Sequence, residues 1–407
     1  MQRWKINLYI LWTSQVISLL SFSLGLPFLS LYIQEFGVTD SDQIKFFTGI
    51  LSAAPAITMA IMAPIWGRLA DKYGRKLMIL RAMLLACLII TGMGLVTNAW
   101  QLVILRLCQG LFTGTITAAT AFIASNTPSN KLSSSLGLMS SASFMGFALG
   151  PIIGGYFAET MGYRFSFYTG GALMFLGFVM VYFLLVEDKS TYGNVKTKTE
   201  RRHSEKGIFT SFIVSLLLVL FFHRVLRSLF SPFIPIFIQE SLGTITGVAS
   251  TTGFINGGIA LLTAISGIVF GKLADRYNKK TILLISVSIS ILISVLVNMT
   301  TSITAFALVY ILLSFFLGGV EPIITAVTAE KTPQENRGTL FGYQATVGSL
   351  GWLASPIIGT YISVNYSTDA ILLLLPVVTI IILGLIYRLK YNETLTKEKD
   401  KCEDLIG

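Results

Sequence analysis

The chain carries the stretch Gly67-Arg-Leu-Ala-Asp-Lys-Tyr-Gly-Arg-Lys76 between two long apolar runs. A near copy, Gly271-Lys-Leu-Ala-Asp-Arg-Tyr-Asn-Lys-Lys280, follows 204 residues later and differs mainly at Asn278, where the first copy has Gly74. Other pairs recur at almost the same spacing: Pro27-Phe28 with Pro232-Phe233, Gln34-Glu35 with Gln239-Glu240, Thr127-Pro128 with Thr332-Pro333, and Pro151-Ile-Ile-Gly154 with Pro356-Ile-Ile-Gly359. The chain is therefore one unit written twice, and this duplication decides the fold.

The composition requires a membrane. Of the 407 residues, 53% are hydrophobic and only 12% are charged, and the mean hydropathy is +0.73. Ordinary soluble domains carry about 25% charged residues. So little charge cannot cover the surface of a soluble protein of this size, and the apolar content is too high for a disordered chain. The three cysteines, Cys87, Cys108 and Cys402, are too few and too scattered for a disulfide framework or a metal site.

Twelve apolar runs are long enough to cross the hydrocarbon layer, which takes about 20 helical residues. They cover residues 7–34, 46–67, 77–97, 100–124, 133–158, 164–186, 208–239, 247–271, 281–299, 302–327, 338–363 and 368–388. Nine of the eleven prolines lie inside these runs, which indicates broken helices and favours a transporter over a passive anchor.

The sequence predicts an all-α membrane protein, with twelve transmembrane helices in two parallel-repeat six-helix bundles around a central cavity. Each half has an even number of spans, so both halves have the same orientation and are related by an axis along the membrane normal. We expect an N-terminal bundle at 1–186, a polar cytoplasmic linker at 187–207, a C-terminal bundle at 208–388 and a cytoplasmic tail at 389–407.

The basic residues predict the orientation. Twenty-five of the 30 Lys and Arg residues fall on the connections that share a side with the two termini, whereas the opposite connections hold only Lys45 and Arg164. Cytoplasmic connections carry such an excess, so both termini are expected in the cytoplasm. The net charge of +10 is thereby explained without a nucleic-acid partner.

With these motifs the chain resembles the major facilitator superfamily over essentially its whole length. Residues 67–76 match the family signature between helices two and three. The resemblance implies a conformational latch that stabilises the outward-facing state and breaks as the two halves rock. The alternative interpretation is a basic loop that only sets topology. The latch residues implied are Gly67, Arg68, Asp71 and Arg75 in the first copy, and Gly271 and Asp275 in the second.

The fifth predicted helix carries a glycine motif, Gly146-Phe-Ala-Leu-Gly150-Pro151-Ile-Ile-Gly154-Gly155. Glycines at every fourth position flatten one helix face, so that a neighbouring helix can pack closely or slide. The pattern resembles the antiporter signature of the family, although plain small-residue packing would also use such a face. The segment Gly25-Leu-Pro27-Phe-Leu-Ser-Leu-Tyr32 resembles an element of twelve-span drug/proton antiporters. Together they imply export driven by the proton motive force, with no other cofactor.

Charges inside the spans are costly and are therefore functional candidates. Arg106 lies in Leu105-Arg-Leu-Cys-Gln-Gly110, which resembles the family's helix-four motif for proton transfer. By family architecture, helices one, four, seven and ten line the cavity, where Glu321 could meet Arg224 or Arg227. Glu321 is then either a proton carrier or half of a permanent ion pair, and His223 either titrates or only packs. The residues expected to couple protons are Glu321, Arg106 and His223, and those expected to line the substrate cavity are Gln15, Gln109, Arg224, Arg227 and Asn256.

Three functions remain open from the sequence. The first is proton-coupled efflux of hydrophobic or amphiphilic drugs. The second is a flippase or exporter of a lipid or another anionic amphiphile, because three intramembrane arginines face one glutamate. The third is a non-transporting receptor or scaffold. No phosphate-binding loop, nucleophile elbow or metal cluster is present, so an enzyme is not expected. The expected partners are an amphiphilic substrate, protons and the lipid bilayer, with the protein acting as a monomer in a bacterial plasma membrane.

Overall fold

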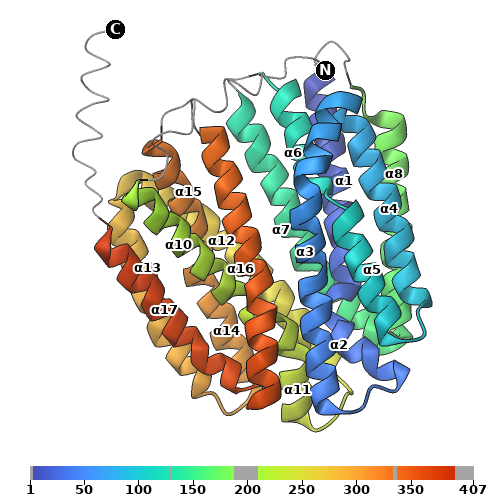
Figure 1. The fold of residues 1–407 in the computed structure, drawn as a ribbon, viewed down its shortest axis with the longest axis vertical. Helices are drawn as coiled ribbons and strands as arrows, with labels where there is room; N and C mark the ends of the chain where they lie inside the picture. Colours follow the sequence, from blue (N-terminus) through green and yellow to red (C-terminus); the bar gives the residue numbers. More distant parts are fainter. Residues whose placement is uncertain (1–2, 129–130, 188–209, 333–336, 390–407) are drawn as a thin grey trace.

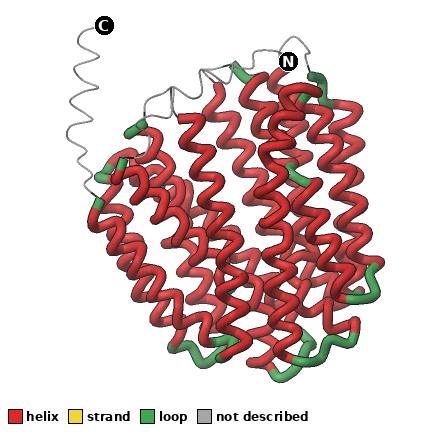
Figure 2. The backbone as a smooth tube through the Cα atoms, viewed as in Figure 1, coloured by secondary structure: helices red, strands yellow, loops and turns green. Residues whose placement is uncertain are grey.

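The structure, a computed structural model, describes residues 3–128, 131–187, 210–332 and 337–389. The described residues form helices and short loops with no strand (Figure 1, Figure 2). Twelve helical segments are long and apolar enough to cross a membrane, and they agree with the twelve predicted runs to within a few residues. The predicted fold class is confirmed. The predicted linker and tail lie almost wholly outside the described residues.

The first six spans form the N-terminal bundle. They are α1 (Arg3–Gly25) continued by η1 (Leu26–Phe28), α2 (Leu29–Tyr32) and η2 (Ile33–Phe36); α3 (Ser41–Tyr73); α4 (Arg75–Leu95); α5 (Ala99–Phe112) with α6 (Thr115–Asn126); α7 (Leu132–Met161); and α8 (Tyr163–Leu184). The C-terminal bundle has α10 (Ser211–Leu229) with η5 (Ser231–Phe233) and α11 (Ile234–Leu242); α12 (Val248–Arg276); α13 (Lys279–Asn298); α14 (Ile303–Gly318) with α15 (Val320–Glu330); α16 (Arg337–Asn365); and α17 (Ala370–Arg388).

Four spans are interrupted, and they are the first, fourth, seventh and tenth. The first and seventh break into 3₁₀ turns at the repeat-related Pro27 and Pro232, because proline cannot donate the backbone hydrogen bond that continues an α-helix. The fourth breaks at Gly114, whose φ of +129° suits glycine, and the tenth breaks at the repeat-related Gly319. The spans that the resemblance placed around the cavity are thus the ones with a broken backbone.

The repeated stretch at residues 67–76 and 271–280 is mostly helical. Residues 67–73 are the end of α3 and residues 271–276 are the end of α12, so the predicted connections shrink to Gly74 and to Tyr277 and Asn278. Gly74 has a φ of +101°, whereas Asn278 has a φ of −60° and its side chain accepts from the Thr281 N–H at 3.2 Å. The residue change between the two copies is therefore a change from a glycine turn to an asparagine helix cap.

The two ends of the molecule differ. One end, here called the terminal face, carries residues 3, 187, 210 and 389, and the other, here called the loop face, carries the short loops that end the odd-numbered spans. The bundles pack through α7 against α12 and through α3 against α16, and their ribbons diverge toward the terminal face (Figure 1). The bundles are therefore joined near the loop face.

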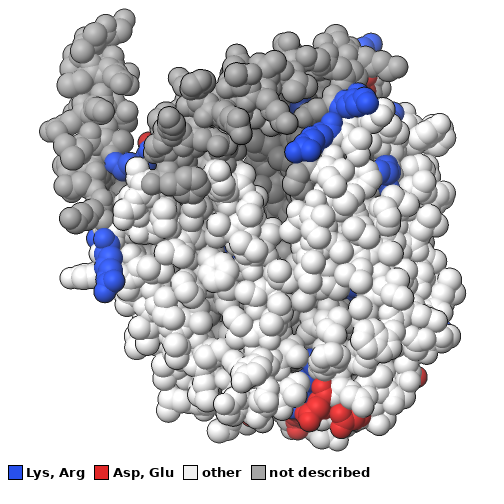
Figure 3. Space-filling view, in the orientation of Figure 1, with Lys and Arg blue, Asp and Glu red and all other residues white. Residues whose placement is uncertain are grey.

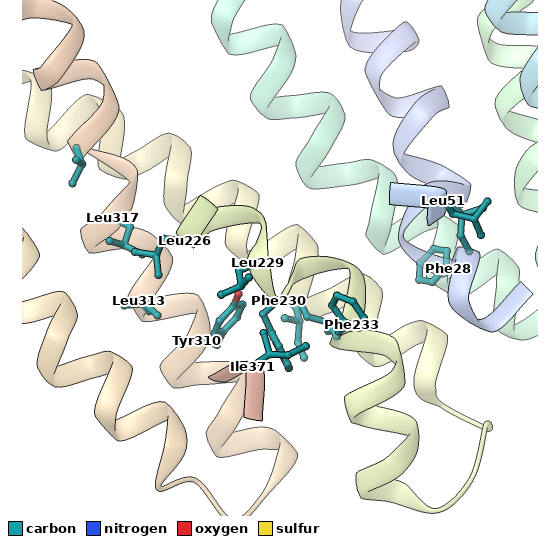
Figure 4. Packing of buried hydrophobic residues seen from close by; sticks show 14 of the residues in the cluster. Phe28, Leu51, Leu226, Leu229, Phe230, Phe233, Tyr310, Leu313, Leu317 and Ile371 are labelled. Carbon is teal, nitrogen blue, oxygen red and sulfur yellow. The ribbon is translucent and has the colours of Figure 1, made fainter. Parts of the chain in front are cut away.

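Aromatic side chains hold the break in the seventh span. The ring of Phe230 lies 5.8 Å from that of Tyr310 and 5.9 Å from that of Phe306, both on α14. Figure 4 shows Leu229, Phe230 and Tyr310 side by side in this packing. In the N-terminal bundle the hydroxyl of Tyr32 donates to the carbonyl of Met93 at 3.0 Å. The breaks in the first and seventh spans are thus each packed against other helices of their own bundle.

Candidate functional site

The guanidinium of Arg224 on α10 forms an ion pair with the carboxylate of Glu321 on α15. Both residues lie near the middle of their spans, yet their side chains are 42% and 28% exposed. Glu321 is in the first turn of α15, directly after the break at Gly319, where the partial positive charge of a helix N-terminus favours a carboxylate. Ionisable residues inside membrane spans are costly and usually functional, so this accessible, paired carboxylate is the main candidate for the functional site.

Glycines on α16 make room for Arg224. A Cβ added to Gly351 would come within 2.9 Å of the Arg224 Cβ, and one added to Gly348 would come within 3.5 Å of its Nε. That Nε atom is buried and has no hydrogen-bond partner in the described part of the chain. Arg224 therefore fills the space that these two glycines leave, and its Nε–H is a hydrogen-bond donor without an acceptor among the described residues.

The other two candidate residues on α10, Arg227 and His223, form hydrogen bonds with other partners. Arg227 donates from Nη2 to the Thr263 hydroxyl on α12 at 3.1 Å. His223 is fully buried, and its Nε2 lies 2.9 Å from the Leu317 carbonyl, so Nε2 carries the proton and donates. Of the two arginines expected near Glu321, the direct partner is Arg224. The geometry of His223 favours the packing alternative.

Arg106 is enclosed within the N-terminal bundle. It is 8% exposed, and its guanidinium donates to the Leu51 carbonyl at 2.7 Å and to the Gln109 side-chain oxygen at 2.5 Å. Gln109 is 6% exposed and Gln15 is 1% exposed, so neither amide faces an accessible surface in this conformation. Asn256 donates to the Thr252 carbonyl at 3.1 Å. Among the five expected substrate residues, Arg224 is thus the one placed in an accessible ion pair.

The glycine motif of α7 packs closely against two helices, α1 and α12. Added Cβ atoms on Gly146, Gly150 and Gly154 would collide with α1, including the backbone at Leu19, Leu20 and Leu24. Gly155 instead faces α12 of the other bundle, where an added Cβ would lie 2.6 Å from the Ala249 carbonyl oxygen. On α12, Gly253 meets the Pro151 carbonyl in the same way. The motif therefore joins α1 within the bundle and α12 across the two bundles.

The implied latch residues make few contacts here. A Cβ added to Gly67 or Gly271 would have nothing within 4 Å, so close helix approach does not require these glycines in this conformation. Arg68 and Asp275 are exposed, and Arg75 donates to the Ala121 carbonyl at 2.7 Å. The side chain of Asp71 lies outside the described residues. Sequence reasoning missed Glu187, whose carboxylate accepts from the backbone N–H groups of Arg75 and Lys76, each at 2.9 Å.

A second missed feature is the polar contact between bundles at the loop face. Gln34 and Gln239 exchange amide hydrogen bonds, and the Lys45 Nζ lies 3.4 Å from a Glu240 carboxylate oxygen. Acidic side chains gather at this end of the molecule in Figure 3. The recurrence of Gln-Glu at 34–35 and 239–240 is the signal for this contact in the sequence, since it places the same pair at the same end of both halves.

A pocket of about 390 Å³ lies at the same face, between the bundles. Its polar lining includes Gln34, Gln239 and Glu240, which already bind one another or Lys45, so their polar groups are occupied. Burial and the nearby Glu240 carboxylate raise the pKa of Asp369 above its ordinary value, against the opposing charge of Lys45. In the described residues no group of three or more His, Cys, Asp or Glu side chains could hold a metal ion.

Comparison with known proteins agrees with this architecture. Models of the Major Facilitator Superfamily match residues 11–222 and 216–403. The chain is 30% identical to the multi-drug resistance efflux pump PmrA homolog of Lactococcus lactis, over 88% of this chain and 89% of that protein. It is 28% identical to the multidrug resistance protein MdtG of Dickeya zeae, over 98% of both.

The solved structures show the fold alone. A bacterial homolog of the human lysosomal transporter Spinster, in an inward-facing and occupied conformation, has a TM-score of 0.77 and 14% identity over 95% of this chain and 97% of that one. The human organic anion transporter MFSD10 has a TM-score of 0.70 and 16% identity over 95% of this chain and 100% of that one. With both sequence halves matched and twelve spans in place, the chain belongs to the Major Facilitator Superfamily and is a multi-pass membrane transporter rather than an enzyme.

Proposed function

We propose that this transporter exports hydrophobic or amphiphilic drugs from bacterial cells in exchange for protons, by alternating access. Two proteins that resemble it over most of their length are named for multidrug resistance, which supports drugs as the cargo. The distribution of basic residues supports a cytoplasmic terminal face. The bundle contacts at the loop face then close the outer side, so this conformation receives substrate from the cytoplasm or the inner leaflet.

The Arg224–Glu321 ion pair is the observation that best supports the proposal of proton coupling. Glu321 is an accessible acid in the middle of a span, beside the break that separates α14 from α15. A carboxylate there can hold either a proton or a positive charge, but not both, so proton binding and cationic-substrate binding exclude each other. Mutual exclusion at one site is what exchange requires, and rocking of the bundles about the α7–α12 and α3–α16 contacts would present the site to each side in turn.

Transport in proteoliposomes tests the proposal. Purified protein should move a lipophilic cationic dye outward faster when a pH gradient, acidic on the outer side, is imposed. Glu321→Gln should abolish the dependence on the gradient, because the amide cannot take up the proton. Glu330→Gln on the same helix is the matched control, since Glu330 pairs with Lys279 at 2.7 Å near the terminal face. Transport by the wild type that ignores the gradient, or normal coupling in Glu321→Gln, would refute the proposal.

A further inference from the structure

The Arg224–Glu321 site carries more positive than negative charge. From α10, Arg224 pairs with Glu321, and Arg227 and His223 lie within electrostatic reach of the same carboxylate. Tyr310 of α14 lies near Arg227, α12 contributes the neutral Thr263, and α16 contributes glycines. If Glu321 is neutralised by a proton, two guanidinium groups remain with no described carboxylate beside them.

Arg224 has the geometry to accept a different anion. Its side chain is 42% exposed even while it is paired with Glu321, and it packs against Gly348 and Gly351, whose missing side chains leave the guanidinium end uncovered by α16. A guanidinium presents donors in a planar fork that matches the two oxygens of a carboxylate or the oxygens of a phosphate group. Glu321 is therefore a replaceable partner of Arg224.

We propose that Arg224 binds the anionic group of an amphiphilic substrate, a carboxylate or a phosphate-type group, in place of Glu321, and that Glu321 takes up one proton from solution as it is displaced. This inference rests on the proposed function only in taking this site as the place where substrate binds. The charges balance, since the site loses one internal carboxylate charge to the proton and gains one from the ligand.

The sign of the pH dependence then follows from the charge of the ligand. An anion competes with Glu321 for Arg224, so acid strengthens its binding by neutralising its competitor. A cation competes with the proton for Glu321, so acid weakens its binding. The two classes should respond to pH in opposite directions at one site. A cation exchanges for the proton, whereas an anion binds together with it, so the exchange proposed above applies to cationic substrates.

The experiment measures binding of a matched pair of probes to the full-length protein in phosphatidylcholine nanodiscs. The probes are 4-phenylbutyrate and 4-phenylbutylamine, which share an apolar body and keep their charges between about pH 6 and pH 8. We expect the affinity for 4-phenylbutyrate to fall by up to about tenfold for each unit of rising pH, as linkage to one proton requires. The affinity for the amine should rise over the same range.

Variants assign the effect to the two residues. Glu321→Gln, which resembles the protonated side chain, should bind 4-phenylbutyrate tightly with no pH dependence. Arg224→Gln should lose most of that binding, and Arg224→Lys, which keeps the charge if the glutamine variant folds poorly, should restore part of it. Arg388→Gln, at the exposed end of α17, is the control and should match the wild type.

Two results would overturn the inference: pH-independent binding of 4-phenylbutyrate to the wild type, or unchanged pH dependence in Glu321→Gln, which would assign the proton to His223. Adding phosphatidylglycerol to the nanodiscs identifies the source of the anion. A loss of 4-phenylbutyrate binding that is larger in the wild type than the surface charge causes in Arg388→Gln and at high salt is not expected for a soluble amphiphile, and competition that persists at high salt indicates the headgroup of an anionic lipid. Binding is measured without transport. If proton-driven efflux is not observed, the proposed anion binding is therefore unaffected. If the anion binding is not observed, the proposed exchange of cations for protons is unaffected.

Discussion

Gln34 and Gln239 bind each other reciprocally: the Nε2 of Gln34 donates to the Oε1 of Gln239 at 2.8 Å, and the Nε2 of Gln239 donates back at 2.9 Å. The two residues are 205 positions apart and occupy the same place in the two copies of the repeat. The repeat thus closes the loop face with a self-complementary contact, as a twofold interface does between two subunits. The neighbouring contact between Lys45 and Glu240 has no such symmetry.

Removing one amide should loosen this closure. Gln34→Ala leaves the Gln239 amide without its partner, and the lost hydrogen bonds are worth about 1 kcal/mol, or roughly a fivefold shift toward a conformation open at the loop face. Spin labels at the exposed Thr39 and Thr244, one on each bundle, would report it as a longer distance. Gln101→Ala is the control, because Gln101 bonds to Thr97 within one bundle. Equal distances in both variants would contradict the role of the pair.

A methyl group on α12 should separate the bundles without unfolding either. The Cβ of Gly253→Ala would collide with the Pro151 carbonyl of α7, and relief of such a clash is worth about 1–3 kcal/mol. We expect this variant to shift toward the conformation open at the loop face. Labelling of a cysteine introduced at that face would measure the shift. Gly267→Ala on the same helix is the matched control, since its Cβ would have nothing within 4 Å. Similar labelling of the two variants would exclude a role for the close contact.

The charge of Asp369 should make the loop face sensitive to pH. Because the pKa of this carboxyl is raised, the fold favours its protonated form. That contribution is present below the ordinary aspartate pKa of about 4 and is lost as the pH rises through the raised value. Asp369→Asn keeps a neutral side chain, so its melting temperature relative to the wild type should increase over that window. Glu240→Gln removes one cause of the shift and should shrink the difference, and a difference independent of pH would disprove the linkage.

The two bundles should depend on different helix caps. Glu187→Ala removes the carboxylate that accepts from the first N–H groups of α4, and Asn278→Ala removes the cap of α13. Each change should cost about 1 kcal/mol of stability, measured by thermal unfolding in detergent. Glu187→Gln keeps one acceptor oxygen and should lose less than Glu187→Ala. A Glu187→Ala protein as stable as the wild type would show that water replaces the cap.

The sequence predicted which residues belong to the site, but it did not predict which of them form an ion pair. The sequence identified Glu321 as the acid deep in a span and Arg224 and Arg227 as its possible partners, because charged residues in apolar runs are visible without a structure. The two arginines are three positions apart on one helix, so a modest rotation of α10 decides which meets Glu321. That rotation depends on packing against α16 and α17, which are far away in the sequence.

Glu187 escaped prediction for a related reason. It lies 112 residues from the backbone group of Arg75 that it caps, at the border of the expected linker, where a charged residue reads as solvated. A cap supplied by a segment far away in the sequence leaves no local pattern, whereas the cap by Asn278 lies three residues from its donor and does.

The sequence by itself determined that this protein crosses a membrane twelve times and is built from two copies of one unit, because hydropathy, charge asymmetry and repeat spacing are properties of the chain. Only the tertiary structure decided that Arg224 is the partner of Glu321, that Gln34 binds its own repeat image Gln239, and that Gly155 and Gly253 join the bundles. Each of these contacts depends on how helices far apart in sequence are rotated and seated against one another. That placement is set by the packing of all twelve spans together, not by any one of them.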